Sequence, residues 1–283
     1  MKVSLKEQLL VMNKTLSLIT SVALSISAFY VEAKTEFSGE FVQGGMVVGK
    51  SDSADKVTLN KKLLPLTSDG QFVFGFGRDD KSSYTLTIVH NDGKVEKKTF
   101  VPKVREYNIQ RINGIKKSIM QPNPKAVARS KKDNLQVKQA RQIGSELTAF
   151  STGFIAPIQG KITGVYGSQR VFNDVPKRPH FGLDYVGKTG DPVMAPASGK
   201  VLLWVPDMFY SGGTMIIDHG HGISSTFLHL SDSYVKTGDM VKQGDVVAAV
   251  GASGRATGPH LDWRINWFDV KIDPEYVLKL KAL

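Results

Sequence analysis

Short runs in which hydrophobic and polar residues alternate cover most of the chain, and turn residues separate these runs. In residues 34–113, Tyr84–Val89 alternates at period two and precedes Asn91-Asp92-Gly93, a sequence typical of a hairpin turn. In residues 151–283, strands are predicted at 199–205, 214–218, 224–230, 246–250 and 261–267. The pattern therefore predicts a mainly β chain, with a small β-sandwich-like domain followed by a C-terminal antiparallel β-sheet domain.

The segment between these two β regions, residues 114–150, has a different composition. Two prolines lie in a polar stretch, and Lys and Arg are frequent in 125–147. The apolar residues of this stretch follow helical spacing imperfectly, which predicts a basic linker that is partly helical. A solvated linker or surface helix is favoured over a wall-binding or partner-binding helix, and both interpretations stay open.

The first 33 residues have the three parts of a secretory signal. Lysines precede an uncharged run at 15–31, and Val31 and Ala33 are suitably small for positions −3 and −1 of a cleavage site after Ala33. A membrane anchor is the alternative, but the run is shorter than the ~20 apolar residues of a spanning helix. We predict a signal peptide at 1–33, export to the periplasm, and no stable membrane insertion after cleavage; Met12 is a second candidate start.

Charge and composition limit which partners and which metal ligands are possible. The chain has 283 residues, a formal net charge of +11 and no cysteine. A basic protein associates with polyanions, but export makes nucleic acid an unsuitable partner. Without thiolates, any transition-metal site must use His, Asp or Glu.

Histidines and aspartates gather between residues 180 and 262. His180 and Asp184 are four residues apart, but the nearby Pro179 and Gly182 argue against a helix, so a loop or strand edge would have to bring them together. On a strand, His260 and Asp262 would project from the same face.

A fifth residue, His229, lies in an apolar, β-branched stretch, where a buried core histidine is the ordinary interpretation. His219 and His221 flank a glycine just before it and are expected to be loop or supporting residues. Of these three histidines, only His229 gains a catalytic interpretation, and only from its order relative to the other motifs.

Taken in order, the motifs resemble the lysostaphin-type, or LytM-type, family of zinc endopeptidases, over about residues 155–275. The motifs that carry the resemblance are His180-x-Gly182-x-Asp184, Asp218-His219-Gly220-x-Gly222, Thr226-x-x-His229-Leu230 and Thr257-Gly258-Pro259-His260-Leu261. The strands of 34–113 and residues 107–112 also resemble the leader domain of an envelope subgroup of this family.

The resemblance implies a sheet with a metal-containing groove and one Zn²⁺ per chain. His180 and Asp184 would be the first two metal ligands, and His229 and His260 the catalytic pair that does not bind metal. The family ends in His-x-His, whose second histidine is the third ligand, and here Asp262 stands in that place. A carboxylate still suits zinc, but the formal charge of the site would fall from +1 to zero, which favours activity at higher pH. Asp262→His is accordingly expected to keep both metal and activity.

The implied function is an exported zinc-dependent endopeptidase that hydrolyses peptide cross-links of peptidoglycan, with an envelope protein left open as a further partner. The alternative is a metal-free LytM-type activator of cell-wall amidases, for which Asp262 would mark a lost metal site. A passive wall-binding module is a third interpretation. The domain organisation predicted is 1–33 signal peptide, 34–113 N-terminal β domain, 114–150 linker and 151–283 zinc metallopeptidase domain.

Overall fold

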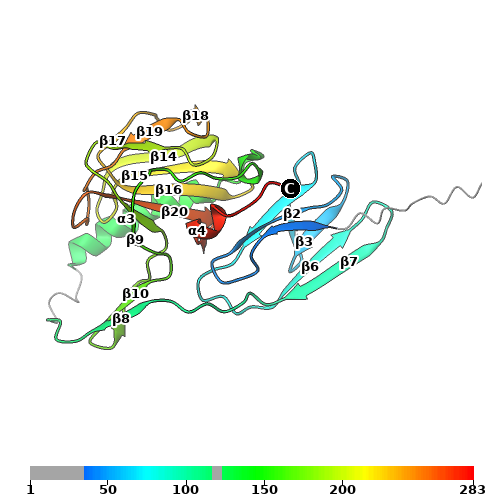
Figure 1. Ribbon diagram of the computed structural model, residues 1–283, viewed down its shortest axis with the longest axis horizontal. Helices are drawn as coiled ribbons and strands as arrows, with labels where there is room; N and C mark the ends of the chain where they lie inside the picture. Colours follow the sequence, from blue (N-terminus) through cyan, green and yellow to red (C-terminus); the bar gives the residue numbers. More distant parts are fainter. Residues whose placement is uncertain (1–34, 117–122) are drawn as a thin grey trace, which may run out of the picture. The chain divides into compact units, whose positions relative to one another are not determined.

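The computed structural model describes residues 35–116 and 123–283 (Figure 1). The described chain is mainly β, as the alternation of hydrophobic and polar residues predicts. Residues 34–283 form one compact unit. The predicted signal peptide lies outside the described residues. In the part that the structure describes, no helix is both long and apolar enough to cross a membrane.

Two antiparallel sheets form the N-terminal β region, and a cluster of aromatic side chains forms its core. Phe72, Phe74 and Phe76 are fully buried, and the Phe41 ring packs edge-on against Phe100 with centroids 4.8 Å apart. The strands, in their order within the sheets, are β1 (Glu36–Gly39), β2 (Met46–Lys50) and β5 (Gln71–Gly75), then β4 (Lys62–Leu64), β3 (Lys56–Leu59), β6 (Tyr84–Val89) and β7 (Val95–Phe100).

The C-terminal region is built on an eight-stranded sheet in which the neighbours are antiparallel (Figure 1). Its strands, in sheet order, are β18 (Met240–Val241), β14 (Gly199–Met208), β15 (Gly212–Gly220), β16 (Ile223–Leu230), β20 (His260–Trp267), β12 (Leu183–Val186) and β9 (Ile162–Gly164), with β21 (Val270–Ile272) paired to β20. A smaller sheet contains β13 (Pro192–Met194), β19 (Val246–Ala249) and β17 (Asp232–Ser233). All five strands predicted in this region are present.

Strand β20 shows how the sheet separates its core from its functional face. Leu261, Trp263 and Ile265 are fully buried in the hydrophobic core. The residues between them, Asp262 and Arg264, point to the opposite face because side chains alternate along a strand. The same alternation that builds the core therefore places the carboxylate of Asp262 and the guanidinium of Arg264 on one face of the strand.

The predicted linker contains helix α3 (Pro124–Arg141). Pro124 lies in the first turn of this helix. Asn123 caps its N-terminus, because the Asn123 side chain accepts a hydrogen bond from the Lys125 N–H. The helix is hydrogen-bonded to the sheet region, because Asp133 accepts from the Phe209 N–H at 2.8 Å. It ends at Arg141, whose Nη2 donates to Thr226 Oγ1 at 2.8 Å. The linker is thus partly helical, and the helix lies against the C-terminal sheet.

One short strand near the predicted domain boundary pairs with the C-terminal region. Strand β8 (Ile109–Ile112) is parallel to β10 (Gln169–Phe172), which also pairs with β11 (Val175–Pro176). The remaining short helices are η1 (Ala149–Ser151) and α4 (Pro274–Val277). The boundaries at 113 and 150 stay predictions, and the pairing of β8 places residues 109–112 with the C-terminal sheets.

Candidate metal and catalytic site

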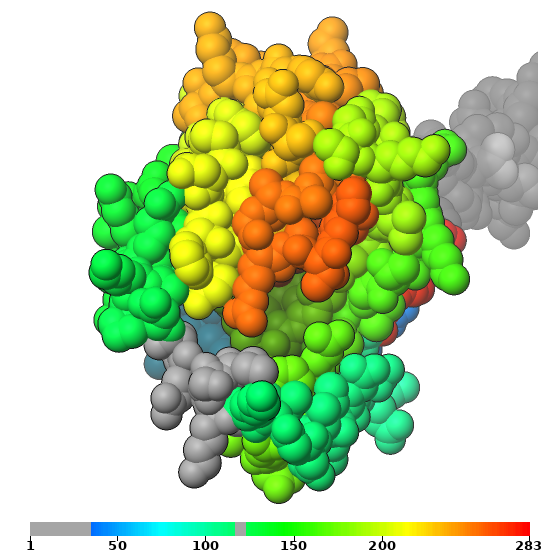
Figure 2. Space-filling model, turned by 90° about the vertical axis from the view of Figure 1, so that its left-hand side faces the viewer, coloured from blue at the N-terminus to red at the C-terminus, as the bar shows by residue number. Residues whose placement is uncertain are grey.

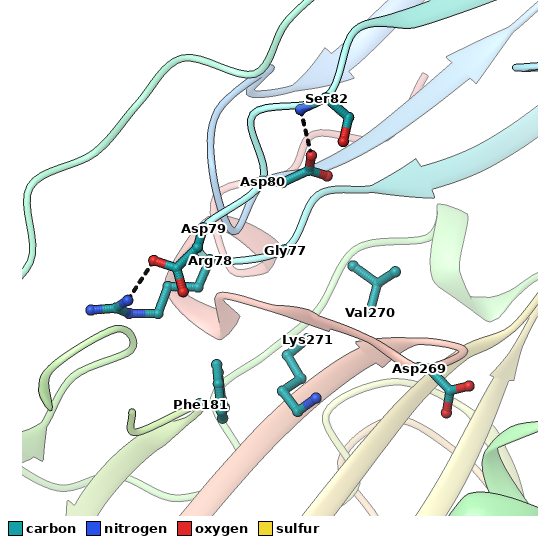
Figure 3. Close-up of a pocket in the computed structure, with 9 residues that line it drawn as sticks. All are labelled: Gly77, Arg78, Asp79, Asp80, Ser82, Phe181, Asp269, Val270 and Lys271. Atoms are coloured by element: carbon teal, nitrogen blue, oxygen red, sulfur yellow. Dashed lines mark hydrogen bonds and ion pairs between the residues drawn. The ribbon is translucent and has the colours of Figure 1, made fainter. Parts of the chain in front are cut away.

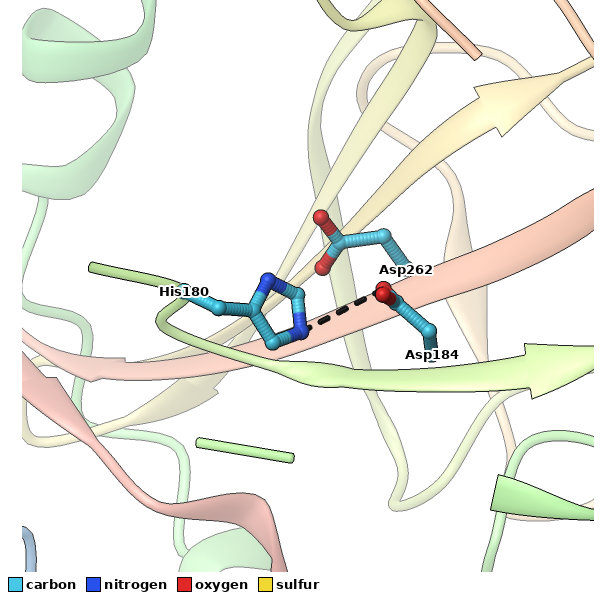
Figure 4. A group of neighbouring side chains, drawn as sticks. All are labelled: His180, Asp184 and Asp262. Atoms are coloured by element: carbon cyan, nitrogen blue, oxygen red, sulfur yellow. Dashed lines mark ion pairs between the residues drawn. The ribbon is translucent and has the colours of Figure 1, made fainter. Parts of the chain in front are cut away.

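Strand register brings the three predicted metal ligands together. Asp184 on β12 lies directly opposite Asp262 on β20 in the antiparallel ladder. His180 reaches the same point from the loop that precedes β12. One possible ligand atom from each residue lies within 4.8 Å of the others (Figure 4). The grouping of these three side chains, expected from the sequence, is thus present in the structure.

The residues fit a metal ion. His180 Nε2 and Asp184 Oδ1 are 3.3 Å apart, yet both atoms are buried and neither has a hydrogen-bond partner. Leaving buried polar atoms unpaired costs about 1–3 kcal/mol each, so such atoms indicate an absent ligand. One imidazole and two carboxylates form a three-ligand set of the kind that catalytic zinc uses, with a fourth position left open.

Two glycines make room for the carboxylates of this group. A Cβ at Gly164 would lie 2.1 Å from Asp184 Oδ2, and a Cβ at Gly182 would lie 2.5 Å from Asp262 Oδ1. Any larger residue at either position would displace a carboxylate. These glycines therefore position the group, a role that their spacing in the sequence did not reveal.

Arg264 is a further residue at this site that the sequence interpretation missed. Its Nε lies 2.9 Å from Asp262 Oδ1, and its Nη2 lies 2.5 Å from Asp262 Oδ2. Burial alone would raise the pKa of Asp262, but the charge and hydrogen bonds of Arg264 lower that pKa below its usual value. Burial raises the pKa of Asp184, and the neighbouring charge of Asp262 raises it further.

The Asp262–Arg264 ion pair corrects the charge expected from the sequence. Zinc and two carboxylates alone carry a formal charge that sums to zero. With the guanidinium of Arg264 included, one zinc ion, two carboxylates and one arginine carry a formal net charge of +1. The expected shift of activity to higher pH therefore loses its electrostatic basis.

His229 and His260 form a pair beside the three predicted metal ligands. Their ring centroids are 4.7 Å apart. His229 Nδ1 lies 2.8 Å from the Ser253 carbonyl oxygen, and His260 Nδ1 lies 2.9 Å from that of Gly258. A carbonyl only accepts, so each Nδ1 carries a hydrogen, and in the neutral form of the ring the lone pair is then on Nε2. Burial lowers the pKa of His229, which keeps the ring neutral and basic near pH 7.

His219 has a structural role in the core. It is fully buried, with Nδ1 donating to the Ser198 carbonyl and Nε2 accepting from the Ser225 hydroxyl, both at 2.8 Å. Trp263 Nε1 donates to the same hydroxyl at 3.2 Å. Burial lowers the pKa of His219 to about 4. This neutral ring joins β15, β16 and β20 beneath the functional face.

The face shown in Figure 2 is hollowed below the orange segment near residue 255, with the green helix α3 at its left margin. This segment lies in the loop that carries Ser253 and Gly258, the two residues whose carbonyls orient the catalytic histidines. A surface recess therefore lies beside the loop that holds the predicted catalytic pair.

Residues 178–274 match the model of peptidase family M23, and this range contains all five predicted site residues. These residues form an M23 peptidase domain. The resemblance to lysostaphin-type, or LytM-type, peptidases drawn from the sequence is thereby confirmed. The roles assigned to the individual residues stay predictions.

Known proteins similar to part of this chain include two that are named as endopeptidases. The peptidoglycan DD-endopeptidase ShyB of Vibrio cholerae is 39% identical over 87 residues, which cover 31% of this chain and 20% of ShyB. The DD-carboxypeptidase/endopeptidase Mpg of Neisseria meningitidis is 37% identical over 91 residues, 31% of this chain and 21% of Mpg. The matched segments thus span about a fifth of the length of these relatives.

The similarity to a solved structure extends beyond the M23 domain. A crystal structure of a candidate M23 peptidase from Pseudomonas aeruginosa superposes with a TM-score of 0.64 at 26% identity. The superposition covers 84% of this chain and 95% of that chain. The superposition therefore includes much of the N-terminal β region as well as the M23 domain.

Proposed function

We propose that this protein is an exported zinc-dependent endopeptidase that hydrolyses peptide cross-links of bacterial peptidoglycan, with one Zn²⁺ per chain. The observation that carries the proposal is the convergence of His180, Asp184 and Asp262, with two buried atoms that lack partners. The substrate class is supported by the names of similar proteins such as the peptidoglycan DD-endopeptidase ShyB. Export to the periplasm rests on the predicted signal peptide at 1–33.

Each residue of the site has a defined task in this proposal. His180, Asp184 and Asp262 would hold the zinc ion, which when bound supplies Lewis acidity toward the scissile carbonyl and the attacking water. His229 and His260 each direct Nδ1 to a carbonyl, so Nε2 of the neutral ring can accept the proton of the water and return it to the leaving amine. Asp262 keeps its charge because Arg264 pairs with it.

The test combines metal content with cleavage of natural substrate. The purified protein should contain about one zinc per chain and release uncross-linked muropeptides from isolated sacculi. Asp262→Ala should lose both properties, whereas Asp232→Ala, an exposed aspartate of the same domain, should keep both. Stoichiometric zinc in Asp262→Ala would remove Asp262 from the ligand set. Zinc without release of muropeptides would contradict the peptidase assignment.

A second candidate function is that of a metal-free activator of cell-wall amidases. One observation favours it, because Arg264 contacts both oxygens of Asp262 and so occupies the predicted third ligand. A carboxylate oxygen has two lone pairs, so Asp262 can keep Arg264 and still bind a metal ion, which is why the peptidase is preferred. Absence of bound zinc, together with faster amidase digestion of sacculi on adding the protein, would establish the activator instead.

A further inference from the structure

Three basic side chains gather beside the candidate metal site without an acidic partner. Arg141 is the last residue of α3, Arg178 lies two residues before His180, and Lys271 is on β21. Among residues 35–116 and 123–283, no carboxylate forms an ion pair with any of these three, here called the basic cluster. Asp269 acts on Arg141 and Lys271 only through its charge at a distance, and Asp262 acts on Arg178 in the same way. The cluster is thus positively charged and available to an anion.

Strand register places the cluster close to the reacting groups. Arg141 Nη2 donates to Thr226 Oγ1, and Thr226 lies directly opposite Arg264 across β16 and β20. Arg264 is two residues from Asp262 on the same face of β20. Strand geometry then separates the Arg141 head from Asp262 by roughly 7 Å, about the length of two extended peptide residues.

The other two members of the cluster flank the residue that follows His180. The guanidinium carbon of Arg178 lies 5.7 Å from the centroid of the Phe181 ring, and Lys271 Nζ lies 5.0 Å from it. Phe181 and Lys271 also line a pocket of about 420 Å³, whose opposite wall carries the paired Arg78 and Asp79 (Figure 3). Lys271 is therefore accessible to a small ligand group.

Burial and mutual repulsion destabilise the positive charges of the basic cluster. Burial, together with the nearby positive charges of Arg264 and Arg178, lowers the pKa of Arg141 to about 10. Burial and the charges of Arg178 and Arg141 also lower the pKa of Lys271. In addition, Arg141 Nε is buried without a hydrogen-bond partner. A bound anion would relieve the repulsion and satisfy this donor.

We propose that Arg141, Arg178 and Lys271 form a carboxylate-binding subsite that selects peptides with a free carboxylate within about two residues of the scissile bond. This inference rests on the proposed function, since it assumes a peptide in the M23 site. Guanidinium groups bind carboxylates through paired hydrogen bonds, which suits two arginines at one subsite. The carboxylate has two sources, the C-terminus of a linear peptide or an acidic side chain within a cross-linked one.

The experiment compares three synthetic peptides of equal length that end in D-Ala-D-Ala. The first has a free C-terminus and a D-Gln side chain, the second has a C-terminal amide and D-Glu, and the third has a C-terminal amide and D-Gln. Their affinities for the metal-free protein are measured by calorimetry at fixed salt, so that no turnover interferes. A charge-assisted contact predicts that the first or the second peptide binds about 10- to 100-fold more tightly than the third, and which one does so identifies the source.

Variants link this selectivity to the cluster. Lys271→Met and Arg141→Met should each bring the ratio of the affinities for the charged and the uncharged peptide close to one. Lys188→Met, at an exposed lysine of the same domain, should leave this ratio unchanged. Equal affinities for all three peptides in the wild type, or an unchanged preference in both cluster variants, would overturn the subsite. Selective binding by a protein that, when loaded with zinc, releases no uncross-linked muropeptides from sacculi would refute the proposed function but not the subsite.

Discussion

The guanidinium of Arg264 binds both carboxylate oxygens of Asp262, two residues earlier on β20. This ion pair is largely buried, with side-chain exposures of 23% and 4%. Removing one member of a buried pair is destabilising by about 3–5 kcal/mol, because the other charge is left uncompensated. Asp262 and Arg264 must therefore be considered as a unit whenever either is changed.

The ion pair revises the expectation that Asp262→His keeps metal and activity. The single variant leaves Arg264 as an unpaired buried cation next to a doubly charged ion, so we expect zinc affinity and the urea midpoint of unfolding both to fall. The double variant Asp262→His/Arg264→Met removes the stranded charge and should recover both. Competition against a zinc chelator and urea titration measure the two effects. A single variant that matches the wild type in both would show that the pair is not coupled to the metal site.

His260→Ala should keep zinc and lose turnover. The imidazole accepts and returns a proton in the proposed function, a contribution of at least ~10²-fold in kcat. The zinc content of the variant should stay near that of the wild type, since His260 is not one of the three grouped ligands. Muropeptide release at the wild-type rate would remove His260 from the catalytic pair.

The acid limb of the pH profile should reflect His229. Burial lowers its pKa in the folded protein, so the ring stays neutral to a pH below its ordinary value of about 6.5. We expect kcat/KM to remain level as the pH falls through 6.5 and to decline only at lower pH. A decline centred above pH 6.5 would contradict a buried neutral His229 as the base.

Gly164→Ala tests how tightly the ligands are positioned. Its new methyl group would lie 2.1 Å from Asp184 Oδ2, so the carboxylate must move away from His180 and Asp262. We expect at least ten-fold weaker zinc binding with an unchanged fold by circular dichroism. Gly77→Ala is the matched control, because nothing lies within 4 Å of a Cβ at that position. Equal zinc affinities in the two variants would show that the position of Asp184 does not limit metal binding.

His219 should make the stability depend on pH. Its pKa is lowered to about 4 in the folded protein but returns to about 6.5 when the chain unfolds. Between these values the unfolded chain binds a proton that the folded chain does not, so the free energy of unfolding falls as the pH falls. The slope for this one group is about 1.4 kcal/mol per pH unit between pH 6.5 and 4. His219→Gln should remove this part of the slope in urea titrations, and an unchanged slope would exclude His219 as its origin.

Much of this molecule follows from the sequence because its signals are local. The alternation at 84–89 and 261–267 predicts strands that are present as β6 and β20. The same alternation correctly predicts that His260 and Asp262 share a face. The order of the histidine motifs identifies the M23 domain, which the comparison with known families confirms.

Other features depend on which strands become neighbours, and no local pattern encodes that choice. The opposition of Asp184 and Asp262, the contact of Arg141 with Thr226, and the pairing of β8 with β10 all join segments far apart in the chain. Arg264 could have been noticed, since a residue two positions from Asp262 on a strand shares its face. Arg264 is the residue that balances the charge of the ligands, and it lies outside the family motifs that identify them.

The most direct test of the proposed site is the zinc content of the purified protein measured beside that of its Asp262→Ala variant, by mass spectrometry of the metal after dialysis. We predict about one zinc per chain in the wild type and almost none in the variant. Equal zinc in both proteins, or none in the wild type, would contradict a metal site formed by His180, Asp184 and Asp262.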